Sequence, residues 1–383
     1  MDEIGVGIVG LGDGGMTNAR VIAGLCREGV MRKHPVGVGV VDLNLDEGLP
    51  NARALAGIPG VRIAALCDPD EGRRYQASKE FPFPGTLYVP SVQELVSLPA
   101  VQLVVVATPD HLHLEPARMA LAAGKLVFVE KPIGVAHQLA EFAMLNEEYP
   151  GKLFVGEKYS HARPIEALLR CRKDLGEFLW GDTAYTMWQC DRIMGGGKWR
   201  TETRYNPAAG GLSHNFMTAL LVADSAIAAI QAKGEVLTYH TNLDRHGGYD
   251  TMIGTLRFMS GRLLNWAVCL AVQDASSPYA HRTVAHTFQF RNGVLTYGPQ
   301  PAADTLIAEG MPVPFEPEPE AAAWAEYNLT IYRRMWLDIL AAIDGQKVPR
   351  HSVRQALNVA HACAKAFDSA AANGAWREVG YRF

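Results

Sequence analysis

The chain has 383 residues, and its 36 Lys and Arg residues against 40 Asp and Glu residues give a formal net charge of −4. This balance provides no basic surface for nucleic acid, and no apolar run reaches the roughly 18 residues that a membrane helix needs. The length accommodates two domains with separate hydrophobic cores. The acidic start Met1-Asp2-Glu3 lacks the features of a secretory signal, so we expect a cytoplasmic protein.

Cysteine and histidine usage gives no sign of a metal site. The six cysteines form no C-x-x-C pair, and the 12 histidines form no H-E-x-x-H motif. We therefore expect reduced thiols and no bound metal.

A glycine loop stands near the start of the chain. Ile4–Val9 is a β-rich run that leads directly into Gly10-Leu11-Gly12-Asp13-Gly14-Gly15, and Met16–Arg27 follows with a helical pattern. In such a loop the glycines allow a tight turn, close approach to a pyrophosphate and close packing of the helix on the strand. The free N–H groups at the helix start then face the phosphates. The loop predicts a dinucleotide site.

Two aspartates compete to bind the ribose hydroxyls of the dinucleotide. Val38–Val41 ends in Asp42 and Val61–Cys67 ends in Asp68, and neither stands at the usual interval of about 20 residues from the glycine loop. We prefer Asp68, which makes residues 28–59 an insertion with Asp42 on an extra strand or loop. A carboxylate here favours NAD because it repels a 2′-phosphate, whereas the nearby Arg73 keeps NADP open.

The next two predicted strands are each followed by polar residues. Val101–Ala107 runs into Thr108-Pro109-Asp110-His111-Leu112-His113, and after the helical segment Glu115–Ala123 the run Leu126–Val129 leads into Glu130-Lys131-Pro132. Ligands bind beyond the carboxyl ends of the strands in parallel α/β sheets. We therefore predict that Thr108, Pro109, His111, His113, Glu130 and Lys131 contact the cofactor, although a histidine near a helix start is as often a capping or surface group.

Lys131 is the first candidate for a catalytic residue. Pro132 fixes its own φ and restricts the residue before it, so the side chain of Lys131 should project in a defined direction. The alternative is a surface lysine in a salt bridge after a strand, since lysines are mostly exposed.

The order of these motifs resembles one family. The glycine loop, Cys67-Asp68-Pro69-Asp70, the segment 107–113 and Glu130-Lys131-Pro132 together are similar to the Gfo/Idh/MocA family of glucose-fructose oxidoreductases and inositol dehydrogenases. The resemblance covers most of the first 160 residues. It implies an α/β fold with an N-terminal Rossmann domain and a doubly wound parallel sheet, a nicotinamide cofactor, and sugar, cyclitol or sugar-acid substrates. It also implies that Lys131 corresponds to the family's catalytic lysine.

Consecutive hairpins in the rest of the chain predict a second domain of the α+β class with an antiparallel or mixed sheet, and the resemblance implies that this sheet is large and open. Strands and hairpins are expected at Gly181–Gln189, Thr251–Phe258, Arg262–Val272, Thr287–Arg291 and Val294–Tyr297. Helices are expected at Ile165–Lys173, Thr218–Ile230, Ala323–Gly345 and Val353–Asn373. We predict a dinucleotide-binding domain at 1–155, a substrate and oligomerisation domain at 156–345, and a C-terminal helix at 346–383 that returns to the first domain.

Candidate substrate-binding residues fall in three segments of this second part. Tyr159, His161 and Arg163 follow an apolar run, Trp199 and Arg200 lie in a basic, aromatic segment, and His214 and Asn215 follow two glycines. Aromatic rings and Arg forks suit polyhydroxylated or acidic small molecules, although such groups also fasten loops.

The chain departs from the family's pattern in the third of these segments. The family has an acidic residue there with a histidine four residues later, whereas this chain has Asn215 and Ala219. We consider His214 and Tyr159, beside Lys131, as catalytic candidates.

Together with the resemblance, which implies the substrate class, these residues predict an NAD(P)-dependent oxidoreductase that moves a hydride between a nicotinamide and a secondary hydroxyl of a sugar, cyclitol or sugar acid. Lys131 would be the base or hold the oxygen. The departure at Ala219 keeps two alternatives open. One is an NAD-dependent glycosidase or lyase that oxidises a sugar hydroxyl transiently. The other is a non-catalytic NAD-binding regulatory protein. An open sheet also predicts a homodimer or homotetramer.

Overall fold

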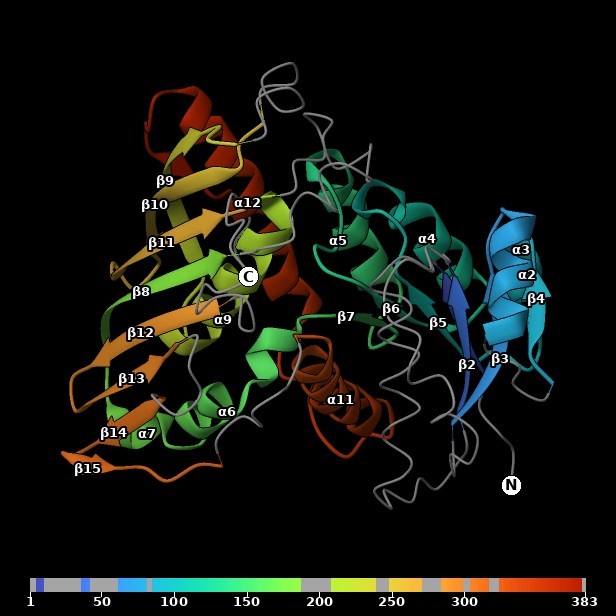
Figure 1. Ribbon diagram of the computed structural model, residues 1–383, viewed down its shortest axis with the longest axis horizontal. Helices are drawn as coiled ribbons and strands as arrows, with labels where there is room; N and C mark the ends of the chain where they lie inside the picture. Colours follow the sequence, from blue (N-terminus) through green and yellow to red (C-terminus); the bar gives the residue numbers. More distant parts are fainter. Residues whose placement is uncertain are drawn as a thin grey trace. The chain divides into compact units, whose positions relative to one another are not determined.

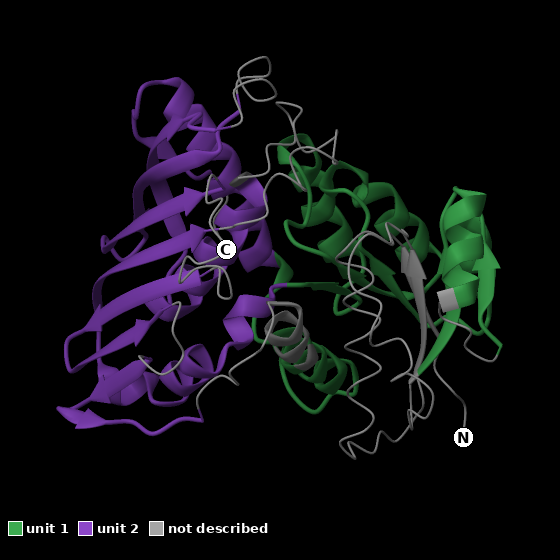
Figure 2. Cartoon of the chain, in the orientation of Figure 1, with its two compact units in different colours: residues 1–156, 328–353 green, residues 157–327, 354–383 purple. Residues whose placement is uncertain are grey.

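The computed structural model describes residues 5–9, 36–41, 61–80, 85–186, 208–238, 248–270, 284–298, 304–316 and 324–380. They form two compact units, one of residues 1–156 and 328–353 and one of residues 157–327 and 354–383 (Figure 2). None of the described helices is both long enough and apolar enough to cross a membrane.

The first unit is built on a seven-stranded parallel sheet (Figure 1). Its strands are β1 (Gly5–Val9), β2 (Val36–Val41), β3 (Val61–Cys67), β4 (Leu87–Val89), β5 (Leu103–Val106), β6 (Leu126–Val129) and β7 (Leu153–Val155). Its helices are α2 (Glu71–Glu80), α3 (Val92–Ser97), α4 (Leu114–Ala122), α5 (Leu139–Glu148), most of α11 (Trp324–Ile343) and the short 3-10 helices η3 (Asp110–Leu112) and η4 (Ala136–Gln138). The predicted doubly wound parallel sheet is confirmed.

The central strands of this sheet are buried on both faces. All four residues of β5 are buried, and three of them are valine. Valine suits a strand because its branched side chain packs well on a pleated surface, and a continuous apolar run is typical of a parallel strand covered on both sides. The extra strand expected within the insertion is present as β2, which pairs in parallel with β3.

The second unit holds a nine-stranded mixed sheet. Its strands are β8 (Phe178–Thr186), β9 (Ile227–Glu235), β10 (Thr251–Phe258), β11 (Leu263–Cys269), β12 (Val284–Phe290), β13 (Gly293–Tyr297), β14 (Thr305–Ala308), β15 (Met311–Pro312) and β16 (Arg377–Glu378). Its helices are η5 (Lys158–His161), α6 (Arg163–Arg170), α7 (Arg172–Leu175), α9 (Ala208–Ala223) and α12 (Val353–Ala371). β8 and β11 pair in parallel and the other pairs are antiparallel, so the predicted mixed sheet is confirmed.

Helices cover one face of the nine-stranded sheet, and within the part of the chain that the structure describes no helix covers the other. Figure 1 shows α6, α9 and α12 along one side of the sheet, where Phe216 of α9 meets Trp266 of β11 edge to face at 5.3 Å. Side chains alternate along a strand, so the residues between the buried ones point to the opposite face. Trp180 and its cross-strand partner Leu263 lie on that face, and each is 46% exposed.

Two predictions about helices in the second unit are wrong. The helix expected at 218–230 instead occupies Ala208–Ala223, and residues 227–235 form the strand β9. Asp224 ends the helix with a positive φ of 50°. The helix also contains the two glycines and the candidate residues His214 and Asn215 that follow them. Gly211 is needed inside it because a Cβ there would lie 2.7 Å from Cδ1 of Tyr185, so only glycine lets that ring approach α9.

The C-terminal helix also differs from the prediction. We assigned residues 346–383 to the first domain, but α12 packs in the second unit, where the Asn358 amide bonds both the N–H and the C=O of Ile227 at the start of β9. The element that joins the first unit is α11, whose Trp336 ring lies 4.3 Å from the ring of Phe128 on β6. Burial of these aromatic rings explains why α11, and not the last helix, packs there.

Candidate functional site

The carboxyl ends of the parallel strands in the first unit lie in one row. Val9 pairs with Cys67 and with Val106, Val106 pairs with Val129, and Val129 pairs with Val155. The next residues along each strand therefore emerge at the same edge of the sheet. Among the described residues they are Asp68, the segment from Ala107, Glu130-Lys131 and Gly156, as expected for a ligand site in a sheet of this kind.

Asp68 stands at this edge as a buried carboxylate. It is 1% exposed, its Oδ1 accepts a hydrogen bond from the N–H of Asp70 at 2.8 Å, and its Oδ2 lies 3.7 Å from Nη1 of Arg73. Asp70 in turn accepts from the N–H of Arg73 at 2.9 Å in the first turn of α2. The carboxylate is thus held in place between β3 and α2, and Arg73 lies beside it.

The segment after β5 is tied to the segment after β6 by His113. The imidazole is completely buried, with Nε2 at 2.8 Å from the carbonyl oxygen of Thr108 and Nδ1 at 3.0 Å from that of Pro132. Both ring nitrogens therefore face backbone oxygens, which favours a structural role for His113 over the predicted contact with the cofactor. Gln138 makes a second tie, because its Nε2 donates to the carbonyl oxygen of His111 at 2.9 Å.

These residues fit a dinucleotide. The hydroxyl Oγ1 of Thr108 is buried and has no hydrogen-bond partner within the part of the chain that the structure describes. A buried polar group is nearly always satisfied in the functional state, so this hydroxyl is available to a ligand group. With the carboxylate of Asp68 after β3 at the same edge of the sheet, the edge offers the polar groups that a ribose or a nicotinamide amide requires.

Lys131 lies at the same edge, beside a buried acid. Glu130 is 6% exposed and its Oε2 accepts from the N–H of Lys131 at 3.2 Å, while the Lys131–Pro132 peptide bond is cis. Gly156 at the end of β7 makes room for this arrangement, since a Cβ there would lie 2.5 Å from Cζ of Phe128 and 3.2 Å from Oε2 of Glu130. The side chain of Lys131 is partly exposed.

Several predicted residues lie outside the described residues. They are the glycine-loop residues Gly10, Gly12, Asp13, Gly14 and Gly15, the segment with Trp199 and Arg200, and Asp42. Their roles stay predictions.

The second unit gathers another group of predicted residues around His214. Its Nδ1 lies 2.5 Å from Oε1 of Glu157, and the rings of Tyr159 and Tyr185 pack against its imidazole. His161 is also buried nearby on η5, where its Nδ1 lies 3.2 Å from the carbonyl oxygen of Glu157. Glu157, Tyr159, His161 and His214 thus form one buried polar cluster.

Two other predicted residues are directed elsewhere. Arg163 pairs with Glu316 at 2.8 Å, and Asn215 donates from Nδ2 to the carbonyl oxygen of Ala267 on β11 at 3.2 Å. These contacts fasten α6 and α9 within the unit. They agree with the alternative that such polar groups have a structural role.

Sequence reasoning missed Glu157. It follows an apolar strand and Gly156, as Glu130 follows β6, and this position at a strand end was the available signal. Its partner His214 is 57 residues away, so the pairing itself has no local pattern in the sequence.

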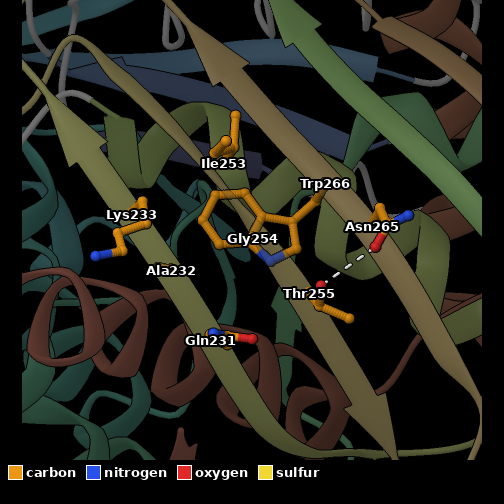
Figure 3. Close-up of a pocket in the computed structure, with 8 residues that line it drawn as sticks. All are labelled: Gln231, Ala232, Lys233, Ile253, Gly254, Thr255, Asn265 and Trp266. Atoms are coloured by element: carbon orange, nitrogen blue, oxygen red, sulfur yellow. Dashed lines mark hydrogen bonds between the residues drawn. The ribbon is translucent and has the colours of Figure 1, made fainter. Parts of the chain in front are cut away.

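A separate pocket of about 340 Å³ lies on the nine-stranded sheet (Figure 3). None of the predicted site residues lines it. Its lining residues come from β9, β10 and β11, and they are Gln231, Ala232, Lys233, Ile253, Gly254, Thr255, Asn265 and Trp266.

The parallel sheet of the first unit, with its polar residues at one edge, defines the class of dinucleotide-binding α/β proteins. Residues 4–156 match the Gfo/Idh/MocA model, described as an oxidoreductase family with an NAD-binding Rossmann fold. These residues of the first unit are thus similar to the NAD-binding part of that family.

Known proteins support this assignment over different parts of the chain. Glycosyl hydrolase family 109 protein 2 of Shewanella sp. (strain ANA-3) is 30% identical over 193 residues, which cover 46% of this chain and 42% of that protein. Inositol 2-dehydrogenase 1 of Saccharopolyspora erythraea is 34% identical over 116 residues, or 28% of this chain and 34% of that protein. The chain thus spans less than half the length of the curated relatives that it matches.

A solved structure shows the fold over the whole chain. A levoglucosan dehydrogenase in complex with NADH has a TM-score of 0.75 and 15% sequence identity, with 100% of both chains covered. The parallel sheet followed by the large mixed sheet is therefore also the fold of that structure.

Proposed function

We propose that the protein is an NAD-dependent oxidoreductase that transfers a hydride between a nicotinamide and a secondary hydroxyl of a sugar, cyclitol or sugar acid. The observation that carries the proposal is the row of strand ends in the first unit, which brings Asp68, Thr108 and Lys131 to one edge of the sheet. The family match over residues 4–156 and the names of the relatives support it.

Each of these side chains has a distinct part in binding or chemistry. The carboxylate of Asp68 accepts hydrogen bonds from the ribose hydroxyls, and the hydroxyl of Thr108 bonds a polar group of the cofactor. A bound nicotinamide would supply the acceptor for the hydride of the carbinol carbon. Lys131 contacts the substrate oxygen, where it holds the negative charge that develops as the hydroxyl proton leaves. Glu130 supports it by accepting from the Lys131 N–H.

The decisive experiment compares two lysines that flank the same strand. Lys131 follows the carboxyl end of β6, while Lys125 precedes its amino end and donates from Nζ to the carbonyl oxygen of Leu98. Lys131→Met should lower kcat by about a hundredfold or more, with the Kd for NADH changed by less than about threefold. Lys125→Met should leave kcat unchanged. The catalytic role would be contradicted if Lys131→Met weakened NADH binding but kept a normal kcat at saturating cofactor.

A second activity is favoured by the match to a glycosyl hydrolase family 109 protein. In a glycosidase that oxidises its substrate only transiently, the cofactor is regenerated in each cycle. A panel of polyols and aryl glycosides distinguishes the two activities. Net oxidation raises absorbance at 340 nm in proportion to the substrate consumed. Transient oxidation releases the aglycone with no net change and exchanges a substrate C–H for solvent deuterium.

We also propose a cytoplasmic homodimer or homotetramer that covers the open face of the nine-stranded sheet. On that face Trp180, Leu263 and Ile253 are 46%, 46% and 57% exposed, and large apolar side chains exposed on one sheet face favour association. The cysteines Cys67, Cys171, Cys269 and Cys363 are free thiols, as expected in a reducing compartment. Sedimentation velocity on the wild type and on Trp180→Glu tests the assembly, because the charge should dissociate it.

A further inference from the structure

The hydrogen-bond ladder between β5 and β6 stops at the carboxyl ends of the two strands. The carbonyl oxygen of Val106, the last residue of β5, accepts from the N–H of Glu130 at 2.9 Å. Bonds in a parallel pair are evenly spaced, so the next one would join the carbonyl oxygen of Thr108 to the nitrogen of Pro132, two residues further along each segment. Proline has no N–H, so this bond cannot form and the ladder ends.

His113 takes the place of the missing bond. Nε2 of its imidazole lies 2.8 Å from the carbonyl oxygen of Thr108, and Nδ1 lies 3.0 Å from the carbonyl oxygen of Pro132. Carbonyl oxygens only accept, so each contact is a hydrogen bond when the ring nitrogen that faces the oxygen carries a proton. The ring is completely buried, and it links the segment after β5 to the segment after β6 through a side chain instead of a backbone N–H.

Two features keep this link in place. His113 is the residue directly before α4, which packs against β5 and β6, and its own carbonyl oxygen accepts from the N–H of Ala117 in the first turn at 3.3 Å. Gln138 adds a second link between the same two segments, since its Nε2 donates to the carbonyl oxygen of His111 at 2.9 Å and its Oε1 accepts from the N–H of Val135 at 3.2 Å. The imidazole is therefore a fixed spacer between the two segments.

Lys131 lies between the last bond of the ladder and the contact with His113. On its amino side the N–H of the preceding residue bonds β5, and on its carboxyl side the carbonyl oxygen of the following proline faces the imidazole. The backbone on both sides of Lys131 is thus tied to the segment after β5, which also carries Thr108. Because each side chain starts from its backbone, the imidazole sets the spacing between the lysine and the threonine.

We propose that His113 is a positioning residue that replaces the ladder bond Pro132 cannot make, and so sets where Lys131 stands relative to the cofactor site at Thr108. The proposal rests on the proposed oxidoreductase function, in which Lys131 contacts the substrate oxygen and Thr108 contacts the cofactor. A displacement of about 1 Å in a catalytic group can cost about a hundredfold in rate, so the link acts on turnover and not only on stability. In this role His113 itself touches neither cofactor nor substrate.

The test compares His113→Leu with His351→Leu as a matched control. His351 is also a buried histidine of the first unit, and its Nε2 lies 2.9 Å from the carbonyl oxygen of Val155 at the end of β7. His113→Leu should lower kcat by about 10- to 100-fold and raise the Kd for NADH by less than about fivefold. His351→Leu should lower stability but leave the kcat of the folded enzyme within about threefold of the wild type. Wild-type kcat in folded His113→Leu overturns the proposal.

A double-mutant comparison separates positioning from a purely structural role. If His113 acts through Lys131, the two residues act as a unit and their losses do not add. His113→Leu should then lower kcat by less than about threefold in the Lys131→Met background. A structural role lowers kcat by the same factor in both backgrounds, and that outcome overturns the proposal.

Amide hydrogen exchange distinguishes the failure of this proposal from the failure of the proposed function. Exchange measured by mass spectrometry should be faster in peptides over residues 107–113 and 130–135 of His113→Leu, but not of His351→Leu. Unchanged exchange would show that the imidazole does not link the two segments, and it overturns the proposal whether or not the enzyme is active.

The activity of the wild type gives the other distinction. If the wild type oxidises no polyol, the function is wrong, while exchange still decides whether His113 links the segments. If the wild type is active and His113→Leu is equally active, the proposal fails and the function stands. Should His113→Leu not fold, His113→Gln keeps an N–H donor for one carbonyl oxygen and should lower kcat by about three- to tenfold, a loss that disappears in the Lys131→Met background. Wild-type kcat in His113→Gln then overturns the proposal.

Discussion

His351 makes the stability of the first unit depend on pH. Its imidazole is buried and its Nε2 donates to the carbonyl oxygen of Val155, the last residue of β7, at 2.9 Å. Burial lowers the pKa of His351 from 6.5 to about 4, and this outweighs the bond to Val155 and the charge of Asp338, which act in the opposite direction. The folded protein thus binds fewer protons here than the unfolded chain between pH 6.5 and pH 4.

The sign and size of the effect follow from this difference. The contribution is fully present above pH 6.5 and is lost as the pH falls from 6.5 toward 4. A shift of 2.5 pKa units corresponds to about 3 kcal/mol in total, of which about 2 kcal/mol is lost between pH 7.5 and pH 5. For a unit of this size, 2 kcal/mol corresponds to a fall of about 4 to 8 °C in Tm.

The assay compares the wild type with His351→Gln, which keeps an N–H donor for Val155 but does not titrate. The free energy of unfolding is measured by urea titration at pH 7.5 and at pH 5. Its fall from pH 7.5 to pH 5 should be about 2 kcal/mol larger in the wild type than in the variant. The pKa of His361 is also lowered, mainly by burial, but this residue is present in both proteins and cancels in the comparison. Equal losses in the two proteins would refute the reasoning.

Three further results are expected. Asp68→Ser should raise the ratio of kcat/KM for NADP to kcat/KM for NAD by about tenfold, because it removes a negative charge and leaves Arg73 beside the ribose. Steady-state kinetics with both cofactors measure this ratio. An unchanged ratio would contradict the role of Asp68 in binding the ribose. Burial raises the pKa of the Cys67 thiol to about 12, so iodoacetamide at pH 8 should modify Cys67 only after the protein unfolds. Peptide mass spectrometry measures the modification, and rapid labelling of Cys67 in the folded protein would contradict this expectation. Asn358→Leu removes the hydrogen bonds to the N–H and C=O of Ile227, and it should lower the free energy of unfolding by about 2 to 4 kcal/mol. Urea titrations measure this loss. A loss below about 1 kcal/mol would show that water replaces the amide.

The two halves of the chain differed in how well they could be predicted. In the first unit β3 and β6 begin and end at the predicted residues, because buried parallel strands are short apolar runs ended by polar residues. In the second unit the segment 227–235, with its three alanines, reads as a continuation of the preceding helix. It is a strand because β10 and β16 pair with it on either side, and that pairing is not local.

The amino-acid sequence alone determined which residues stand at the ends of the parallel strands, and so it made Asp68, Thr108 and Lys131 candidate site residues. That was possible because a strand buried on both faces is a short apolar run that can be recognised locally. In a parallel sheet the carboxyl ends of the strands also lie at one edge, which is where ligands bind. Only the tertiary structure decided that His113 bonds backbone oxygens and that Glu157 meets His214. These contacts join segments that are far apart in the chain, so their geometry depends on packing and leaves no periodic pattern in the sequence.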